Sequence, residues 1–301
     1  MRGFTATSER LSPEEVVKIL NFYLGHMADA IAEYQGTIDE FMGDEILVLF
    51  GAPIARKDDP ERAIACGVAM QQAMQKVNQQ MRAWDLPALE MGIGIHTEEV
   101  VVGNIGSEKR TKYGVVGSQV NLTYRIESYT TGSQIFISDS TLQEVGNIVE
   151  IRSSKQVFPK GVKEPIYIHE VAGIVGEYNL HLAEEKEIFV DVREPIAVQY
   201  SIVKGKDISP EKLIGEIVKL SAKEAEVRVA KVAPMSLPKP LDNIKLNWLN
   251  PEIPELAEDV YAKVLEKAAQ PHHFYIKFTA QPPAIQLKLT KIYQELLAAS
   301  E

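Results

Sequence analysis

Apolar and polar positions in the first part of the chain alternate between a helical and an extended period. Over residues 8–35, apolar residues recur every three or four positions, which predicts a long amphipathic helix. Its start is predicted at Ser12 and Pro13, because a capping hydroxyl precedes a proline and two acids that suit the positive end of a helix dipole. Gly36 predicts its end. Residues 58–84, again with a proline near the start, predict a second long helix.

Short apolar runs bounded by turn residues predict the strands that follow. The runs "GTID" and "EILVLF" are predicted to pair through the turn "FMGD", and "ALEMGIGIHT" is predicted to pair with "EVVVGNIG". The pattern then predicts a short strand in "YGVVG" and a helix in "SQVNLTYRIESYT". It predicts a strand followed by a capped helix in "SQIFISDSTLQEV", and a final strand pair in "QVFPKGVKEPIYIHEV". This order favours an α+β sandwich in which helices cover one sheet.

The pattern changes near residues 172–192, where acids and glycines interrupt the periodicity. Beyond this point, runs of alternating apolar and polar residues are separated by turn residues every ~8–12 positions, which predicts a small antiparallel β-barrel. An amphipathic helix is predicted at the end of the chain. We therefore expect a first domain over 1–174, a linker over 175–192, and a barrel with a terminal helix over 193–301.

Composition narrows the class of protein. The 301 residues suffice for about two domains at ~150 residues each. The net charge of -10 argues against a general nucleic-acid binder, which would carry a basic face. The single cysteine, Cys66, cannot form an internal disulfide and fits a reducing compartment. No apolar run approaches the ~20 residues that span a bilayer, and the first residues hold no signal-peptide core, so we expect a cytoplasmic protein without a membrane span.

Acidic residues crowd the turn between the first two predicted strands. Asp39 and Glu40 precede Gly43, and Asp44 and Glu45 follow it. A carboxylate at the end of a rigid strand suits a hard cation such as Mg²⁺ or Mn²⁺. Taken alone, however, the hairpin is explained more simply as a polar turn, since short turns are rich in acids.

Five segments in order change that interpretation: "GFTATSERLSPEEVV", "GTIDEFMGDEILVLFGAP", "DDPERAIACGVAMQQAM", "MGIGIHTEEVVVGNIGSEKRTKYGVVGSQVNLTYRIES" and "FPKGVKEPIYIHEVAGI". Together they resemble the class III adenylyl/guanylyl cyclase catalytic domain, over residues 1 to about 174. The resemblance implies an α+β cyclase fold with a ferredoxin-like βαββαβ core and helices on the sheet. It implies conversion of ATP or GTP to a 3′,5′-cyclic nucleotide and pyrophosphate, assisted by two Mg²⁺ or Mn²⁺ ions, in a homodimer whose active sites are shared by both chains.

The resemblance also assigns roles to residues. Asp44 matches a metal-binding aspartate. Asn121 and Arg125, four apart on a predicted helix and hence on one face, match the pair that orients the ribose and stabilises the developing phosphate charge. Lys160 matches a triphosphate-binding lysine. The backbone loop that cradles phosphates is matched by Gly3, Phe4 and Thr5.

Two positions concern the base. Glu40 stands where the family reads the purine, usually with Lys for ATP and Glu for GTP, and its partner position falls on Gly114, where members usually have Asp, Thr or Cys. A carboxylate can accept both N–H donors of guanine, which favours GTP, but it could also accept the amino group of adenine. The choice between GTP and ATP stays open.

One departure bears on activity. The family's opening strand carries a metal-binding aspartate just before the position of Met1, in "F-x-D-I-x-G-F-T", whereas this sequence starts at "MRGFT". We therefore expect a truncated cyclase domain that lacks its first strand and one metal aspartate. The alternative is a catalytically impaired signalling or dimerisation module of the same fold.

The second domain resembles a PilZ-type barrel. That family holds cyclic di-GMP through an R-x-x-x-R arm and a [DN]-x-S-x-x-G loop. Here "KLSAKE" retains Ser221 but has Lys219 and Glu224 at the Asp and Gly positions, and Arg193 stands without a second arginine. Cyclic di-GMP is therefore not expected to bind by this motif, and an accessory role in interaction or signal relay is predicted.

Overall fold

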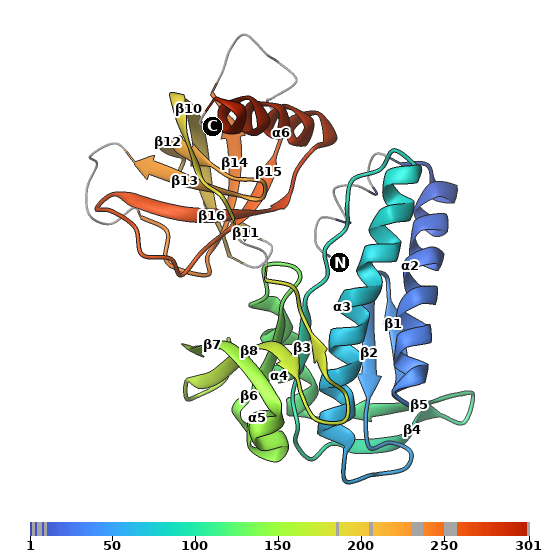
Figure 1. Cartoon of the computed structure of the whole chain (residues 1–301). Coiled ribbons are helices and arrows are strands. Elements are labelled where there is room, and N and C mark those ends of the chain that lie inside the picture. The colour runs from blue at the N-terminus through green and yellow to red at the C-terminus, as the bar shows by residue number, and fades with distance from the viewer. Residues whose placement is uncertain are drawn as a thin grey trace. The chain divides into compact units, whose positions relative to one another are not determined.

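The structure is a computed structural model that describes all residues except 2–3, 5–7, 9–10, 185–186, 205–206, 230–236, 250–257 and 300–301. The chain forms two compact units, the first ending at Glu184 and the second formed mainly by the rest of the chain (Figure 1). The described elements of the first unit are α2 Pro13–Glu33, β1 Thr37–Met42, β2 Glu45–Leu49, α3 Asp59–Ala83, β3 Ile93–Ile95, β4 Val101–Ser107, β5 Arg110–Val116, α4 Ser118–Ser128, β6 Ile135–Ser138, α5 Asp139–Val145, the short helix Gly146–Ile148, β7 Val149–Val157, β8 Ile166–Ile174 and β9 Leu180–His181.

The two long predicted helices, α2 and α3, pack side by side (Figure 1). Helix α2 begins as its sequence predicts: the Ser12 hydroxyl accepts from the Glu15 N–H, and the Glu15 carboxylate accepts from the Ser12 N–H. Apolar residues one helical turn apart, including Tyr23 and Met27 on α2 and Met70 on α3, are buried between the helices. Each such side chain contributes about 1.5–3 kcal/mol by its removal from water.

The strands of the first unit form three sheets among the described residues, and not the single sheet that was expected. Strands β3, β6, β8 and β7 form one sheet in that order, with β9 paired to β8, while β1–β2 and β4–β5 are separate hairpins. The predicted pairing of β3 with β4 is wrong. Strand β3 pairs in parallel with β6, and β4 pairs along seven positions with β5. A period of two predicts a strand but does not identify its partner, so the sequence pattern could not make this choice.

Apolar residues on both sides of this sheet position the site. All four residues of β6 are buried, and its Ile135 and Ile137 pack with Ile64 and Val68 of α3. Helix α4, which carries the candidate catalytic residues, lies between β5 and β6 in the chain and contacts β3 and β6. The predicted α+β class is therefore confirmed, although this sheet order does not by itself establish a ferredoxin-like core.

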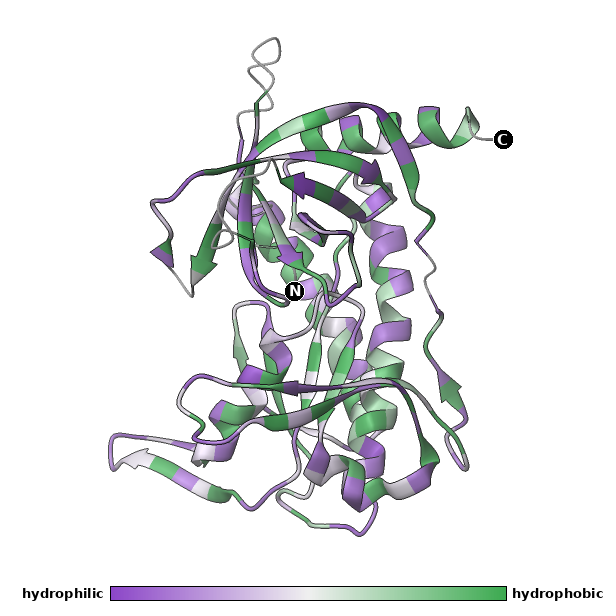
Figure 2. Cartoon of the chain, turned by 90° about the vertical axis from the view of Figure 1, so that its left-hand side faces the viewer, coloured by the Kyte–Doolittle hydropathy of each residue, from purple (hydrophilic) through white to green (hydrophobic). Residues whose placement is uncertain are grey.

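The second unit contains the predicted barrel. Its elements are β10 Val190–Lys204, β11 Asp207–Ile208, β12 Leu213–Leu220, β13 Glu224–Val229, β14 Asn243–Trp248, β15 Val260–Val264, β16 His273–Ala280 and α6 Pro283–Ala298. Within the described residues, six strands follow the order β10-β12-β13-β16-β15-β14, and a β14–β10 pairing closes the ring. Bands of apolar and polar residues alternate along its strands (Figure 2). Ile285 and Leu289 of α6 join the barrel core. Across the described part of the chain, every helix is too short or too polar to cross a bilayer.

Candidate active site

Two adjacent carboxylates of β1 share one lysine of β5. The Lys112 ammonium lies 3.0 Å from a carboxylate oxygen of Glu40 and 3.3 Å from one of Asp39. The hydrogen bond to Glu40 is the main cause that raises the pKa of Lys112, so this lysine is a cation at neutral pH. The Glu40 side chain is 46% exposed, whereas that of Asp39 is 4% exposed. Glu40 and Lys112 therefore present an acceptor and a donor side by side to solvent.

Gly114 and Tyr124 complete this part of the site. Gly114 is buried on β5, two residues after Lys112, and faces the Asp39 carboxylate. Tyr124, on α4, donates a hydrogen bond to the sulfur of Met42. Burial first, and then the nearby acids including Glu45 and Glu40, raise the pKa of Tyr124, so its hydroxyl stays protonated. The two base-reading positions predicted from sequence thus lie at one place, joined by Lys112 and Asp39.

Asn121 and Arg125 share one side of α4, as predicted. Asn121 is exposed and Arg125 is half-buried. The Nη1 atom of Arg125 is buried and has no hydrogen-bond partner among the described groups. A buried guanidinium N–H without an acceptor is costly, about 1–3 kcal/mol or more. This nitrogen is therefore a candidate donor to an anion absent from the structure.

The turn after β7 brings the predicted phosphate-binding lysine to this arginine. Gly161 follows Lys160 in a left-handed conformation, with φ +79°. A Cβ atom at Gly161 would lie 3.4 Å from Nη1 of Arg125, so the turn passes directly against the guanidinium. Lys160 precedes Gly161 in this turn, and its side chain is exposed. The fold thus brings the turn that carries Lys160 against Arg125, from segments over thirty residues apart in the chain.

Asp44 lies in the turn of the β1–β2 hairpin, where Gly43 supplies the left-handed conformation with φ +64°. Its side chain is 23% exposed and forms an ion pair with the terminal ammonium of Met1. Of the remaining predicted loop residues, Phe4 is buried in the helix core, while Gly3 and Thr5 lie outside the described residues.

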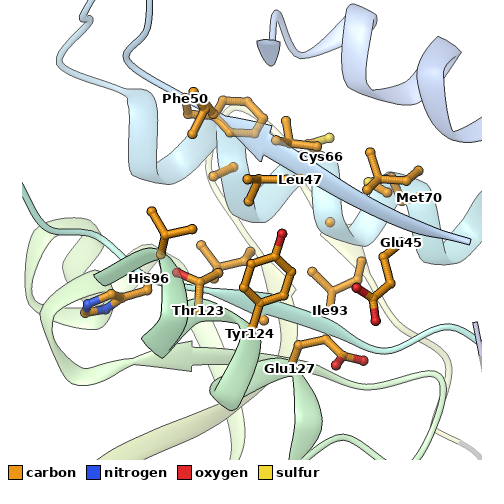
Figure 3. A pocket seen from close by; sticks show the side chains of 18 of the residues that line it. Glu45, Leu47, Phe50, Cys66, Met70, Ile93, His96, Thr123, Tyr124 and Glu127 are labelled. Carbon is orange, nitrogen blue, oxygen red and sulfur yellow. The ribbon is translucent and has the colours of Figure 1, made fainter. Parts of the chain in front are cut away.

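A pocket of about 280 Å³ adjoins Asp44. It is lined by β2 and β3 with parts of α3 and α4, and Leu47 and Tyr124 point into it from opposite sides (Figure 3). Within the described strands, β2 pairs only with β1 and β3 only with β6, so each has one unpaired edge. Burial, then Asp44 and Glu127, raise the pKa of Tyr23 at the pocket wall. The pocket is thus bordered by two strands that each retain the capacity to pair.

The structure brings the predicted residues together in two groups. Glu40 and Gly114 lie in one group with Asp39 and Lys112, and Arg125 lies against the turn of Lys160 in the other. No hydrogen bond or ion pair in the described part of the chain joins Asp44 to Asn121 or Arg125. Sequence reasoning missed Asp39, Lys112 and Tyr124. Three sequence features could have pointed to these residues: a second acid beside Glu40, a lysine two residues before Gly114, and an aromatic residue directly before Arg125.

The donor set fits a divalent cation only in part. Asp44 offers a partly exposed carboxylate, and Mg²⁺ is commonly held by one or two carboxylates together with substrate phosphates. Among the described residues, no group of three or more His, Cys, Asp or Glu side chains could enclose a metal ion. Asp44 can therefore serve as one ligand, with the others supplied by the nucleotide, water or a further carboxylate.

In the second unit, the positions that correspond to the cyclic di-GMP loop make internal contacts. Ser221 is buried, and its hydroxyl accepts from the Glu224 N–H and donates to the Glu224 carbonyl. The Lys219 ammonium lies 3.2 Å from a carboxylate oxygen of Glu226. Arg193 is exposed on β10. The loop is a closed turn between β12 and β13, and the proposed PilZ relationship is not confirmed.

Known proteins resemble the first unit. Residues 1–172 match the family described as "Adenylate and Guanylate cyclase catalytic domain". Adenylate cyclase 1 of Rhizobium meliloti (strain 1021) is 33% identical over 178 residues, and the adenylate cyclase of Anabaena cylindrica is 36% identical over 180 residues. These matches cover 58% and 57% of this chain but only 27% and 35% of those proteins. The chain thus spans about a third of the length of these relatives.

Two solved structures are similar at higher coverage. The guanylyl cyclase Cya2 is 66% identical, with a TM-score of 0.60, and the match covers 61% of this chain and 93% of that one. The adenylyl cyclase CyaB from P. aeruginosa is 35% identical, with a TM-score of 0.56, and the match covers 60% and 92%. The family match spans more than half of the chain and ends within β8. The chain therefore belongs to the adenylate and guanylate cyclase catalytic-domain family.

Proposed function

We propose that the first unit is a nucleotide cyclase that converts a purine nucleoside triphosphate to a 3′,5′-cyclic nucleotide and pyrophosphate. The observation that carries this is the Nη1 atom of Arg125, which is buried against the turn of Lys160 and has no hydrogen-bond partner among the described residues. A guanidinium donates to phosphate oxygens in pairs, and a nearby ammonium adds a second cation. In this reaction the ribose 3′-oxygen attacks the α-phosphorus, its proton is lost, and the bond to the pyrophosphate leaving group breaks. Arg125 would bind charge that grows on the phosphate, with Asn121 orienting the ribose.

GTP is the substrate that we propose. The Watson–Crick edge of guanine carries N–H donors and the O6 acceptor, which match the Glu40 carboxylate and the Lys112 ammonium 3.0 Å from it. Adenine would place its N1 acceptor against a carboxylate. The 66%-identical relative is a guanylyl cyclase, which supports this choice, whereas the curated relatives named above are adenylate cyclases. ATP remains the alternative substrate.

We also propose that two copies share each active site. No hydrogen bond or ion pair joins Asp44 to Arg125 within the described residues, although the proposed reaction would use both at one substrate. The β4–β5 hairpin exposes several apolar side chains, and Val101 is 68% exposed. Such a surface is typical of a protein interface. Sedimentation during turnover should show a dimer, and an active monomer would contradict this proposal.

A divalent cation bound at Asp44 would neutralise phosphate charge and assist ionisation of the attacking hydroxyl. Among the described residues, Asp44 is not part of a group of three or more His, Cys, Asp or Glu side chains that could hold an ion, and this observation favours the second candidate, a catalytically impaired signalling or dimerisation module. We propose that the pocket between β2 and β3 accepts one more strand, because each of these strands has one unpaired edge within the described residues. An aspartate on that strand would add a second carboxylate near Asp44.

Three versions of the full chain test these alternatives. The first is the chain itself, and the others carry an N-terminal extension with the pattern F-x-D-I or F-x-N-I. Each is incubated with GTP or ATP and Mn²⁺, and cyclic product and Mn²⁺ affinity are measured. We expect the aspartate extension to raise both, and Asp44→Asn to abolish the gain. Absence of cyclic product from the folded, aspartate-extended chain with either nucleotide would establish the non-enzymatic alternative.

For the second unit we propose an accessory role without cyclic di-GMP, because Ser221 and Lys219 are engaged within the barrel. Titration of the full chain with cyclic di-GMP, followed by calorimetry, should show no heat of binding. Micromolar binding would instead identify a cyclic di-GMP receptor.

A further inference from the structure

Asp39 has a buried carboxylate, and only one of its two oxygens accepts a hydrogen bond from the described residues. One of its oxygens, Oδ2, accepts from the Lys112 ammonium at 3.3 Å. The other, Oδ1, is buried and has no hydrogen-bond partner among the described groups. Buried polar atoms in proteins are normally hydrogen-bonded, and a carboxylate oxygen without a donor is costly. This oxygen therefore points to a donor that is absent from the structure.

A bulge in β1 explains how Asp39 reaches this place. Successive residues of a strand face opposite sides, so Asp39 and Glu40 would normally diverge. In the β1–β2 ladder, however, the register shifts between Ile38 and Glu40, and Asp39 has no cross-strand partner. Bulges re-aim side chains, and here Asp39 and Glu40 both reach Lys112. The two carboxylates therefore face the same site.

Gly114 leaves the space that Asp39 occupies. A Cβ atom at position 114 would lie 3.4 Å from Oδ1 of Asp39 and 4.0 Å from Oδ2. A side chain at 114 would thus project toward the Asp39 carboxylate. Because glycine has no side chain, the carboxylate at this point comes from β1 instead of β5.

We propose that Asp39 takes the place of a base-reading side chain at position 114 and determines specificity for guanine. Its Oδ1 accepts a hydrogen bond from the exocyclic 2-amino group, while Glu40 accepts from the ring N1–H. Lys112 holds both carboxylates in place. This inference rests on the proposed function, since it requires a purine nucleotide at this site, and it identifies which group of the base is recognised.

Removal of the 2-amino group from the ligand tests this contact. The 3′-deoxy forms of GTP and of inosine triphosphate, which lacks that amino group, cannot cyclise and report binding alone. Their affinities for the full chain are measured by calorimetry with Mg²⁺. A charge-assisted hydrogen bond predicts that the wild type binds the guanine ligand about tenfold to a hundredfold more tightly. We expect Asp39→Ala to lose this preference while keeping its affinity for the inosine ligand.

Two further variants separate recognition from folding. Asp39→Asn keeps the volume of the side chain and should also lose most of the preference. Asp39→Ala combined with Gly114→Asp should regain it, because the new carboxylate enters the same space from β5. Asp29→Ala, an exposed position on α2, is the matched control and should behave as the wild type.

The outcomes distinguish the inference from the proposed function. If the wild type binds neither purine triphosphate, the proposed function fails and Asp39 recognition fails with it. If guanine binds but Asp39→Ala keeps the full preference, or weakens both ligands equally, the proposed function stands. In that case Asp39 acts only through Lys112 or the fold, and the inference is overturned.

Discussion

Arg125 lies directly against Gly161. A Cβ atom added to Gly161 would stand 3.4 Å from Nη1 and 3.6 Å from Nη2 of the guanidinium. Nη1 is the atom for which the described part of the chain supplies no hydrogen-bond partner. The turn after β7 therefore restricts the orientation of the Arg125 side chain by contact alone. It makes no hydrogen bond to Nη1, so this nitrogen stays able to donate. This relationship links a helix side chain to a loop conformation that only glycine adopts easily.

Gly161→Ala should impair nucleotide binding more than it impairs folding. Its φ of +79° makes alanine strained by about 1 kcal/mol, and the new methyl group would press on Arg125. Gly176→Ala is the matched control, because Gly176 has φ +75° and an open space around its Cβ position. Thermal melts should show similar losses for both variants, and nucleotide titrations a loss for Gly161→Ala alone. Equal binding by the two variants would contradict a role for this contact.

Arg125→Ala should lower the cyclase activity, and Arg125→Lys should lower it as well. A single donor to developing charge is worth about 10²–10³-fold in kcat, and the lysine ammonium lacks the paired geometry of guanidinium. In the extended, metal-competent chain, we expect kcat to fall for both variants while KM changes little. Arg82→Ala, at an exposed position of α3, should leave both constants unchanged. Substantial activity in Arg125→Lys would show that only a point charge is needed.

Glu40→Lys should shift the nucleotide preference toward ATP. A lysine there would meet Lys112, whose ammonium lies 3.0 Å from the present carboxylate, and would remove the acceptor for guanine. The ratio of GTP to ATP affinity should fall at least about tenfold, as expected for loss of one charged hydrogen bond. Binding competition between the two nucleotides measures this ratio. Glu33→Lys, at an exposed position of α2, serves as the control, and an unchanged ratio in Glu40→Lys would exclude base reading by this residue.

Glu226→Gln should change the acid stability of the barrel. The Glu226 side chain is 3% exposed, and burial alone would raise its pKa. Hydrogen bonds from His273, Tyr275 and Lys219 outweigh burial and lower the pKa below its ordinary value of 4.5. Because the folded pKa is depressed, the stabilisation is complete above pH 4.5 and is lost as the pH falls through the folded value.

Thermal melts between pH 7 and pH 3 measure this effect. Glu226→Gln should cost roughly 2 kcal/mol at pH 7, since it removes a charged acceptor of several hydrogen bonds. Its stability should then fall less steeply than that of the wild type below pH 4.5. Glu216→Gln is a suitable control, because Glu216 is 44% exposed and forms its ion pair with Arg228 on the neighbouring strand. Parallel pH profiles for wild type and Glu226→Gln would contradict the prediction.

The sequence predicted local structure well wherever a local cause sufficed. The cap at Ser12, the helical face of Tyr23 and Met27, and the turn at Gly43 depend on neighbours within a few residues. The resemblance to the cyclase family predicted that Asn121, Arg125 and Lys160 belong to one site. The structure places Arg125 against the turn that carries Lys160. The partner of β3 could not be predicted, because a three-residue strand carries too little pattern to select β6 over β4.

What the sequence by itself determined is the set of elements, the family, and the residues of α4 that face one way, because helical spacing and capping are properties of contiguous chain. Only the tertiary structure decided that Asp39 and Glu40 both meet Lys112, that Gly114 leaves room for a carboxylate, and that Nη1 of Arg125 is buried without a partner. These are relations between distant strands and loops. They depend on a one-residue bulge and on close approaches of a few ångströms, which no periodicity along the chain encodes.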